Sequence, residues 1–151
     1  MSVNRLRRQS GFTLIEVLVA LLILGIGLLG LTGLQAHSLR NNYNAYLRTQ
    51  ATFNVYEIID RMRANRTYAL TGGYDTAFTS SATGGDCSAG CSAVEMKNAD
   101  LNQWLSMVSR LPGGEGSIAV NAGEAVVTVR WYDRRDGDDT NYLEFAARSQ
   151  L

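Results

Sequence analysis

The sequence contains few of the residue types that carry out chemistry in enzymes. His37 is the only histidine, which argues against Ser-His-Asp catalysis and against metal sites built from several histidines. Cys87 and Cys91 are the only cysteines, too few for a disulfide scaffold or a four-cysteine zinc site. We therefore expect a protein that is not an enzyme, with no cofactor, no bound metal and no small-molecule substrate.

One carboxylate within a long apolar stretch is the most informative residue of the sequence. Glu16 lies near the start of Phe12–Leu34, and every residue from Val17 to Leu31 is apolar or glycine. The free energy of inserting a carboxylate into a membrane rises to about 2.5–3.5 kcal/mol in the middle of the bilayer and is smaller near the bilayer surface. Carboxylates inside membrane helices therefore usually have a function. The alternative is that Glu16 only extends to the membrane surface from the first turn of a helix.

The apolar stretch is long enough to cross a membrane. As a helix its 23 residues span about 35 Å, against a hydrocarbon core of about 30 Å. Three arginines precede it, and the positive-inside rule then places residues 1–11 in the cytoplasm and residues 35–151 outside. A cleaved signal peptide is the alternative, with a weak cleavage site at residues 32–36. Against it, the apolar stretch continues into a helical pattern without a break.

The residues Gly-Phe-Thr-Leu-Ile-Glu at positions 11–16 resemble the prepilin motif of type IV pilins and their relatives. The resemblance implies that a prepilin peptidase cleaves after Gly11, that the helix is retained and that the new N-terminal residue, Phe12, is N-methylated. It also implies that Glu16 neutralises the Phe12 ammonium group of an adjacent subunit. In a low dielectric such a pair constrains axial register, because an unpaired charge there is strongly penalised.

A looser resemblance extends beyond this motif. The apolar run after Val17, the Leu-Asn-Gln-Trp-Leu segment and the residues Arg-Trp-Tyr-Asp at 130–133 are similar to the minor pilins of the PilV type, called type IV pilus modification proteins. This similarity implies a function in type IV pilus assembly, with other major and minor pilins as partners. A pseudopilin of a type II secretion system shares the motif and remains the alternative. A membrane-anchored hydrolase or binding module is a third class, for which no catalytic constellation is found.

Beyond the apolar stretch, the spacing of apolar residues predicts that the helix continues to about Asn65. Steps of three and four residues define one stripe of an amphipathic helix, made of Leu39, Tyr43, Leu47, Ala51, Val55, Ile58 and Met62. Glu57 and Arg61 lie off this stripe at the spacing of a helical ion pair. A helix from Phe12 to Asn65 would be about 80 Å long.

The cysteines lie in a segment, residues 71–93, that reads as a loop because it is rich in glycine, serine and threonine. Since the predicted topology places this loop outside the cytoplasm, a disulfide between Cys87 and Cys91 is the leading interpretation. A redox motif would have two intervening residues and a following helix. A metal site would need further ligands, which the sequence does not supply.

The remaining sequence predicts one short helix and a sheet of three or four strands, three of which can be placed. Asp100 is expected to cap the helix, which Pro112-Gly113-Gly114 would follow. The strands are expected at 117–121, 125–132 and 141–147, with a hairpin turn at 121–124.

An acidic segment follows the second predicted strand, with aspartates at positions 133, 136, 138 and 139. Four carboxylates could suit Ca²⁺, but their spacing is not that of a calcium loop and two arginines lie among them. We interpret the segment as a solvated turn.

Together these patterns predict an α+β fold in which a long membrane-spanning helical spine packs against a small antiparallel sheet, as in pilins. We expect a leader at 1–11, a transmembrane helix at 12–34, an amphipathic half of the spine at 35–66 and a globular domain at 67–151. The protein should lie in the inner membrane as a single-pass protein with its C-terminal domain in the periplasm, and in the pilus after assembly. The formal net charge is zero, so nucleic acid is not an indicated partner.

Overall fold

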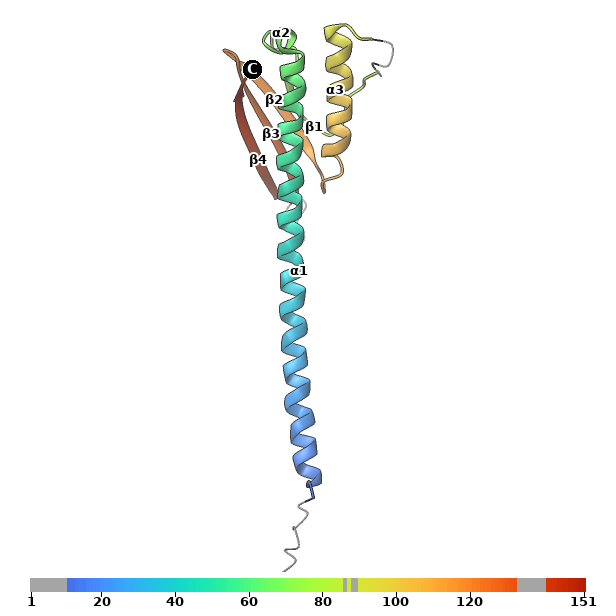
Figure 1. The fold of residues 1–151 in the computed structure, drawn as a ribbon, viewed down its shortest axis with the longest axis vertical. Helices are drawn as coiled ribbons and strands as arrows, with labels where there is room; N and C mark the ends of the chain where they lie inside the picture. The colour runs from blue at the N-terminus through green and yellow to red at the C-terminus, as the bar shows by residue number, and fades with distance from the viewer. Residues whose placement is uncertain (1–10, 86, 88–89, 133–140) are drawn as a thin grey trace, which may run out of the picture. The chain divides into compact units, whose positions relative to one another are not determined.

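The computed structural model describes residues 11–85, 87, 90–132 and 141–151. The chain divides into two compact units, one that ends at Tyr43 and one that spans Asn44–Leu151. A long helix, labelled α1 in Figure 1, begins in the first unit and ends in the second. The second unit adds two further helices and a four-stranded sheet to the end of α1.

Helix α1 spans Leu14–Ala64, 51 residues, which confirms the predicted continuous spine. No proline interrupts it, so every residue after the first turn can donate its backbone N–H to the helix. Thr13 caps its start, because its Oγ1 accepts a hydrogen bond from the backbone N–H of Glu16 at 3.3 Å. The helix ends where Asn65 leaves the helical conformation (φ −108°, ψ 40°), and the short helix α2 follows at Arg66–Ala69.

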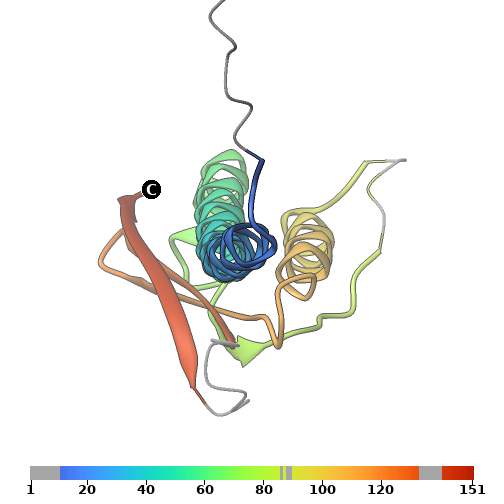
Figure 2. The same ribbon diagram turned by 90° about the horizontal axis from the view of Figure 1, so that it is seen from below.

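The buried face of α1 begins at Leu47 and continues to Met62. Leu39 and Tyr43 were expected in the same stripe, but they are 69% and 47% exposed. A periodic stripe shows which residues share a helix face but not whether another part of the chain covers that face. In the second unit α1 and α3 cover one face of the sheet (Figures 1 and 2).

The sheet is antiparallel throughout and its strands follow the order of the chain. They are β1 at Thr76–Thr79, β2 at Glu115–Asn121, β3 at Glu124–Tyr132 and β4 at Tyr142–Gln150. The turn between β2 and β3 holds Ala122 at φ 51° and Gly123 at φ 84°. Two successive positive φ angles are typical of the tight hairpin turns that match the twist of a sheet. The three predicted strands are thus present, and β1 adds a fourth.

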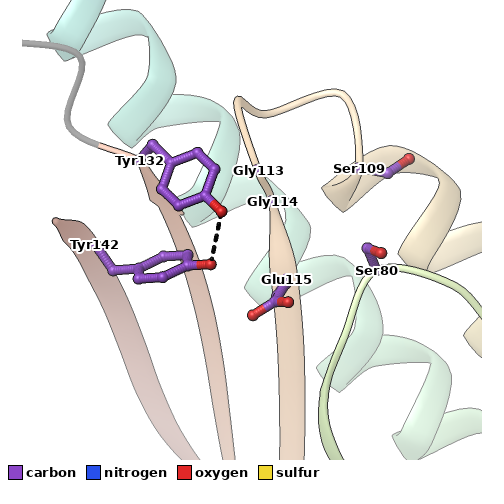
Figure 3. Close-up of a pocket in the computed structure, with 7 residues that line it drawn as sticks. All are labelled: Ser80, Ser109, Gly113, Gly114, Glu115, Tyr132 and Tyr142. Carbon is purple, nitrogen blue, oxygen red and sulfur yellow. Dashed lines mark hydrogen bonds between the residues drawn. The ribbon is translucent and has the colours of Figure 1, made fainter. Parts of the chain in front are cut away.

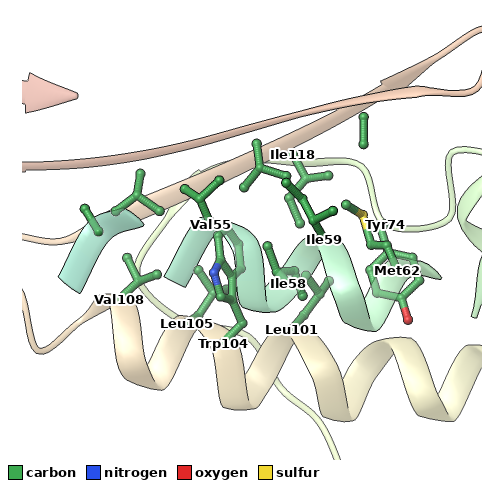
Figure 4. Packing of buried hydrophobic residues seen from close by; sticks show 14 of the residues in the cluster. Val55, Ile58, Ile59, Met62, Tyr74, Leu101, Trp104, Leu105, Val108 and Ile118 are labelled. Atoms are coloured by element: carbon green, nitrogen blue, oxygen red, sulfur yellow. The ribbon is translucent and has the colours of Figure 1, made fainter. Parts of the chain in front are cut away.

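Strand β3 shows the alternation that its sequence predicts, with Val127, Val129 and Trp131 buried and the residues between them partly exposed. Figure 4 shows how α1, α3 and β2 enclose the buried side chains of the second unit. Trp104 of α3 is fully buried, and its Nε1–H donates to the backbone oxygen of Asn54 at 2.9 Å. A Cβ at Gly116 would lie 2.4 Å from the Trp104 ring, so only glycine lets β2 approach this closely.

Two local predictions are wrong. Helix α3 spans Ala93–Val108, so Asp100 lies in its middle rather than at its cap. The true cap is Ser92, which forms a reciprocal capping box with Glu95 and therefore starts the helix earlier. Strand β1 lies within the segment that composition assigned to a loop, where it pairs with β2.

Candidate functional site

The predicted cleavage site lies in an exposed segment before the helix. Gly11, Phe12 and Thr13 precede the first turn of α1, and the Phe12 side chain is 84% exposed. A Cβ placed on Gly11 would meet no atom within 4 Å. Among the described residues, nothing therefore covers Gly11 or the Phe12 side chain.

Glu16 lies in the first turn of α1, three residues after the cap. Besides the bond to Thr13 Oγ1, its backbone N–H also donates to the Thr13 oxygen, at 3.1 Å. A carboxylate in this turn is stabilised by the partial positive charge of the helix N-terminus. Its side chain is exposed, and among the described residues no group forms a hydrogen bond or ion pair with the carboxylate. The carboxylate is thus available to a cation from another molecule.

The apolar stretch after Glu16 is exposed along its whole length. Its large side chains are 48–74% exposed from Val17 to Leu34. In the part of the chain that the structure describes, α1 is the one helix long and apolar enough to cross a membrane. Water is an unfavourable environment for this much contiguous apolar surface, so the stretch needs lipid or other protein around it.

Cys87 and Cys91 form a disulfide, with their Cα atoms 5.3 Å apart. The bridge lies between β1 and α3 and ends one residue before the Ser92 cap. Because the cysteines are oxidised, they supply neither a thiolate nucleophile nor a metal ligand.

A buried polar cluster joins the end of α1 to α3, and sequence reasoning missed it. The Tyr74 hydroxyl donates to Asp100 Oδ2 at 2.6 Å, and Arg61 Nη1 donates to Asp100 Oδ1 at 3.3 Å. Asn65 Nδ2 donates to Tyr74 Oη at 3.2 Å and to the Ala93 oxygen at 2.8 Å. The predicted Glu57–Arg61 pair is present beside it. Burial, together with the hydrogen bond to Asp100, raises the pKa of Tyr74 far above its ordinary value.

No signal in the sequence identifies this cluster, since its members come from three separate segments. Its hydrogen bonds connect helices and a loop to one another and leave the tyrosine protonated at neutral pH. We assign it a role in fixing the position of α3 against α1.

The other candidate residues do not assemble into a site among the described residues. His37 is exposed on α1, and none of the described hydrogen bonds or ion pairs involves it. In the described ranges no group of three or more His, Cys, Asp or Glu side chains is placed to hold a metal ion. The aspartates at positions 133–139 lie outside the described residues.

Comparison with known proteins identifies the N-terminal segment. Residues 6–32 match the family model described as the prokaryotic N-terminal methylation motif. No curated protein and no solved structure matches the chain. The matched region includes the Gly11–Phe12 bond, Glu16 and most of the apolar stretch. It supports a type IV pilin-like protein that is processed by prepilin peptidase, anchored in the inner membrane by a single helix and assembled with other pilins.

Proposed function

We propose that this chain is a minor pilin that acts in type IV pilus assembly as a pilus modification protein. The observation that carries the proposal is the methylation motif, joined without a break to an exposed apolar helix. A signal peptide would be discarded, whereas α1 continues from the motif into the core of the second unit. This continuity supports the retention of the helix in the mature protein.

In this proposal, cleavage after Gly11 exposes the amine of Phe12, which is then methylated. The Glu16 carboxylate of one subunit binds the Phe12 ammonium group of a neighbour. The free carboxylate in the first turn of α1 supports this role. Within an apolar filament core the pair would set the axial position of one subunit against the next, because either charge alone would be costly.

The proposal places the second unit in the periplasm. The arginines before the apolar stretch favour a cytoplasmic leader. The disulfide is consistent with an oxidising compartment for the other end of the chain. The protein is then a structural component of the pilus and not an enzyme.

The N-terminus of the mature protein is the direct test. Mass spectrometry of the membrane fraction should find a first residue Phe12 with a methylated amine, and Gly11→Ala should leave the leader attached. A mature protein that starts near Ala36 would instead establish an ordinary signal peptide and contradict the proposal.

A second measurement separates a minor pilin from a pseudopilin, which carries the same motif. Sheared surface pili from a strain with intact pilus assembly should contain this protein. Its absence from pili, combined with a secretion defect in a deletion strain, would favour the pseudopilin.

A further inference from the structure

A shallow pocket at one end of the sheet is lined by side chains that pack against one another. The ring centroids of Tyr132 and Tyr142 are 4.7 Å apart, and a Cβ at Gly113 would lie 2.0 Å from the Tyr132 ring (Figure 3). The Arg130 guanidinium lies over the Tyr142 ring, 4.4 Å from its centroid. The tyrosines of this pocket are therefore engaged in contacts within the chain.

The part of α1 just beyond the apolar stretch differs from the pocket, because its polar side chains have no partner among the described residues. His37, Arg40 and Asn41 are exposed, and none of the described hydrogen bonds or ion pairs involves their side chains. They belong to the first unit, which ends at Tyr43. Since they follow one another at steps of three and four residues, they share one face of the helix, which we call the juxtamembrane face.

The charge along this part of the sequence has one sign. Between Glu16 and Glu57 the sequence contains no carboxylate, and Arg40 and Arg48 are its charged side chains there. Ion pairs within a helix join residues three or four positions apart, so α1 itself offers Arg40 no counter-ion. An anion that pairs with Arg40 therefore comes from outside this helix.

The position of Arg40 matches the headgroup layer of a bilayer that surrounds the apolar stretch. Arg40 follows Leu34, the end of that stretch, by about 9 Å of helix. The headgroup layer extends about 5–8 Å beyond the hydrocarbon core. Side chains of a helix tilt toward its N-terminus, here toward the membrane, so the long arginine side chain brings its guanidinium back into this layer. Arg48 follows Leu34 by about 21 Å and is out of reach.

We propose that the juxtamembrane face binds the headgroup of an acidic phospholipid in the leaflet next to the second unit. The lipid phosphodiester supplies a negative charge for Arg40 and acceptor oxygens for the N–H groups of His37 and Asn41. Tyr43, which is 47% exposed, lies one turn further on and adds the kind of aromatic side chain that is enriched at membrane surfaces.

The inference rests on the retained helix of the proposed function and adds a lipid partner to it. Cleavage after Gly11 removes the arginines of the leader. Arg40 is then the cationic side chain closest in sequence to the apolar stretch, and its lipid contact would hold the processed helix at a fixed depth before assembly.

The test measures lipid binding by the full chain in an uncharged detergent. Native mass spectrometry with equal amounts of phosphatidylglycerol and phosphatidylcholine gives the ratio of acidic to zwitterionic lipid that stays bound. Arg40→Gln should lower this ratio by about two- to fivefold, the effect of one arginine near an anionic surface. The leader arginines are the same in every variant, so the change in the ratio reports Arg40.

Two further variants separate a headgroup contact from a general effect of charge or folding. Arg48→Gln removes the same charge outside the headgroup layer and should leave the ratio unchanged. The double variant Arg40→Gln, Asn41→Arg restores a cation at nearly the same depth on the same face and should recover the wild-type ratio.

The proposal is overturned if Arg40→Gln keeps the wild-type ratio, if Arg48→Gln lowers it equally, or if the double variant does not recover it. It is also overturned if inorganic phosphate removes the preference more than chloride does at the same ionic strength, because the face would then bind a free anion. The N-terminus of the mature protein and its presence in pili are measured separately, so failure of the proposed function is distinguishable from failure of this inference.

Discussion

The two halves of α1 differ in their surroundings although they form one continuous helix. Up to Tyr43 the apolar side chains are exposed, with Ile23 at 64%. From Leu47 to Met62 one face of the helix is buried, with Ile58 at 0%. From Val17 to Leu31 the first half is apolar on all sides, and the second half is apolar on the side that faces the sheet and α3.

This difference shows that the same secondary structure can be stabilised in two ways. The second half is held by a core within its own chain, where each buried side chain contributes to the unfolding free energy. The first half has no such core and depends on lipid or on other subunits. Substitutions in the two halves should therefore affect different measurements, and four predictions use this contrast.

The largest difference is expected in incorporation into pili, between a variant of Glu16 in the first half and a variant of Glu57 in the second half. Glu16→Gln removes the proposed intermolecular charge pair while it keeps the size of the side chain, so the processed protein should remain in the membrane and be almost absent from sheared pili. Glu57→Gln alters only an ion pair within the helix and should leave incorporation unchanged. The measurement is the ratio of protein in pili to protein in membranes. A Glu16→Gln protein that enters pili normally would refute the pairing role.

Two isoleucines on the same helix give the next largest contrast. Ile58→Ala should lower the unfolding free energy of the second unit by about 2–5 kcal/mol, because it leaves a cavity in a closed core. Ile23→Ala should change it by less than about 0.5 kcal/mol, because that side chain contributes nothing to the core. Chemical denaturation of the full chain in detergent, followed by tryptophan fluorescence, measures both. Equal effects would mean that the two halves share one core.

Removal of the disulfide should have a moderate effect on the second unit. The bridge closes a ring of only five residues. The double variant Cys87→Ser, Cys91→Ser should therefore lower the unfolding free energy by at most about 2 kcal/mol and leave the unit folded. Mass analysis of the wild type without reductant should show a protein two hydrogens lighter than the reduced form. Free thiols that are rapidly alkylated in the purified wild type would contradict the bridge.

The smallest effect concerns the buried polar cluster. Tyr74→Phe should lower the unfolding free energy of the second unit by about 1–2 kcal/mol. It removes one hydrogen bond to Asp100 and leaves the Asn65 amide with one acceptor fewer. The raised pKa of Tyr74 means that the folded state keeps this proton more tightly than the unfolded state does. Stability should therefore be constant at neutral pH and fall as pH rises above about 10, where the unfolded tyrosine ionises.

The pH dependence also separates the variant from the wild type. Tyr74→Phe should reduce the loss of stability at alkaline pH, because the group that titrates is gone. Thermal unfolding of both proteins between pH 7 and about pH 11 checks this. Identical curves would show that Tyr74 does not control the alkaline transition.

Much of the fold could be predicted because its signals are local. The length of α1 follows from an apolar stretch joined to a helical repeat without proline, and the three long strands follow from alternation and turn residues. Asp100 shows where local reasoning fails. Its type suits a helix cap, but its carboxylate is occupied by Tyr74 and Arg61, which are distant in the sequence.

Neither strand β1 nor the exposure of Leu39 and Tyr43 could be predicted from the sequence, for a related reason. A four-residue strand in a segment of small polar residues has too little pattern of its own, and it forms because β2 offers an edge. An apolar stripe on a helix predicts a face that could be buried, but burial needs a second element opposite it. In this chain that element covers the helix only from Leu47 onward.

The sequence by itself determined the N-terminal motif. The motif at residues 11–16 is contiguous, so it can be recognised without any tertiary contact. Tertiary structure alone decided which polar residues of the second unit meet. Tyr74 donates a hydrogen bond to Asp100, because chain folding brings these distant segments within the few ångströms over which hydrogen bonds act. In the same way, folding places Tyr132, Tyr142 and Ser80 around one pocket.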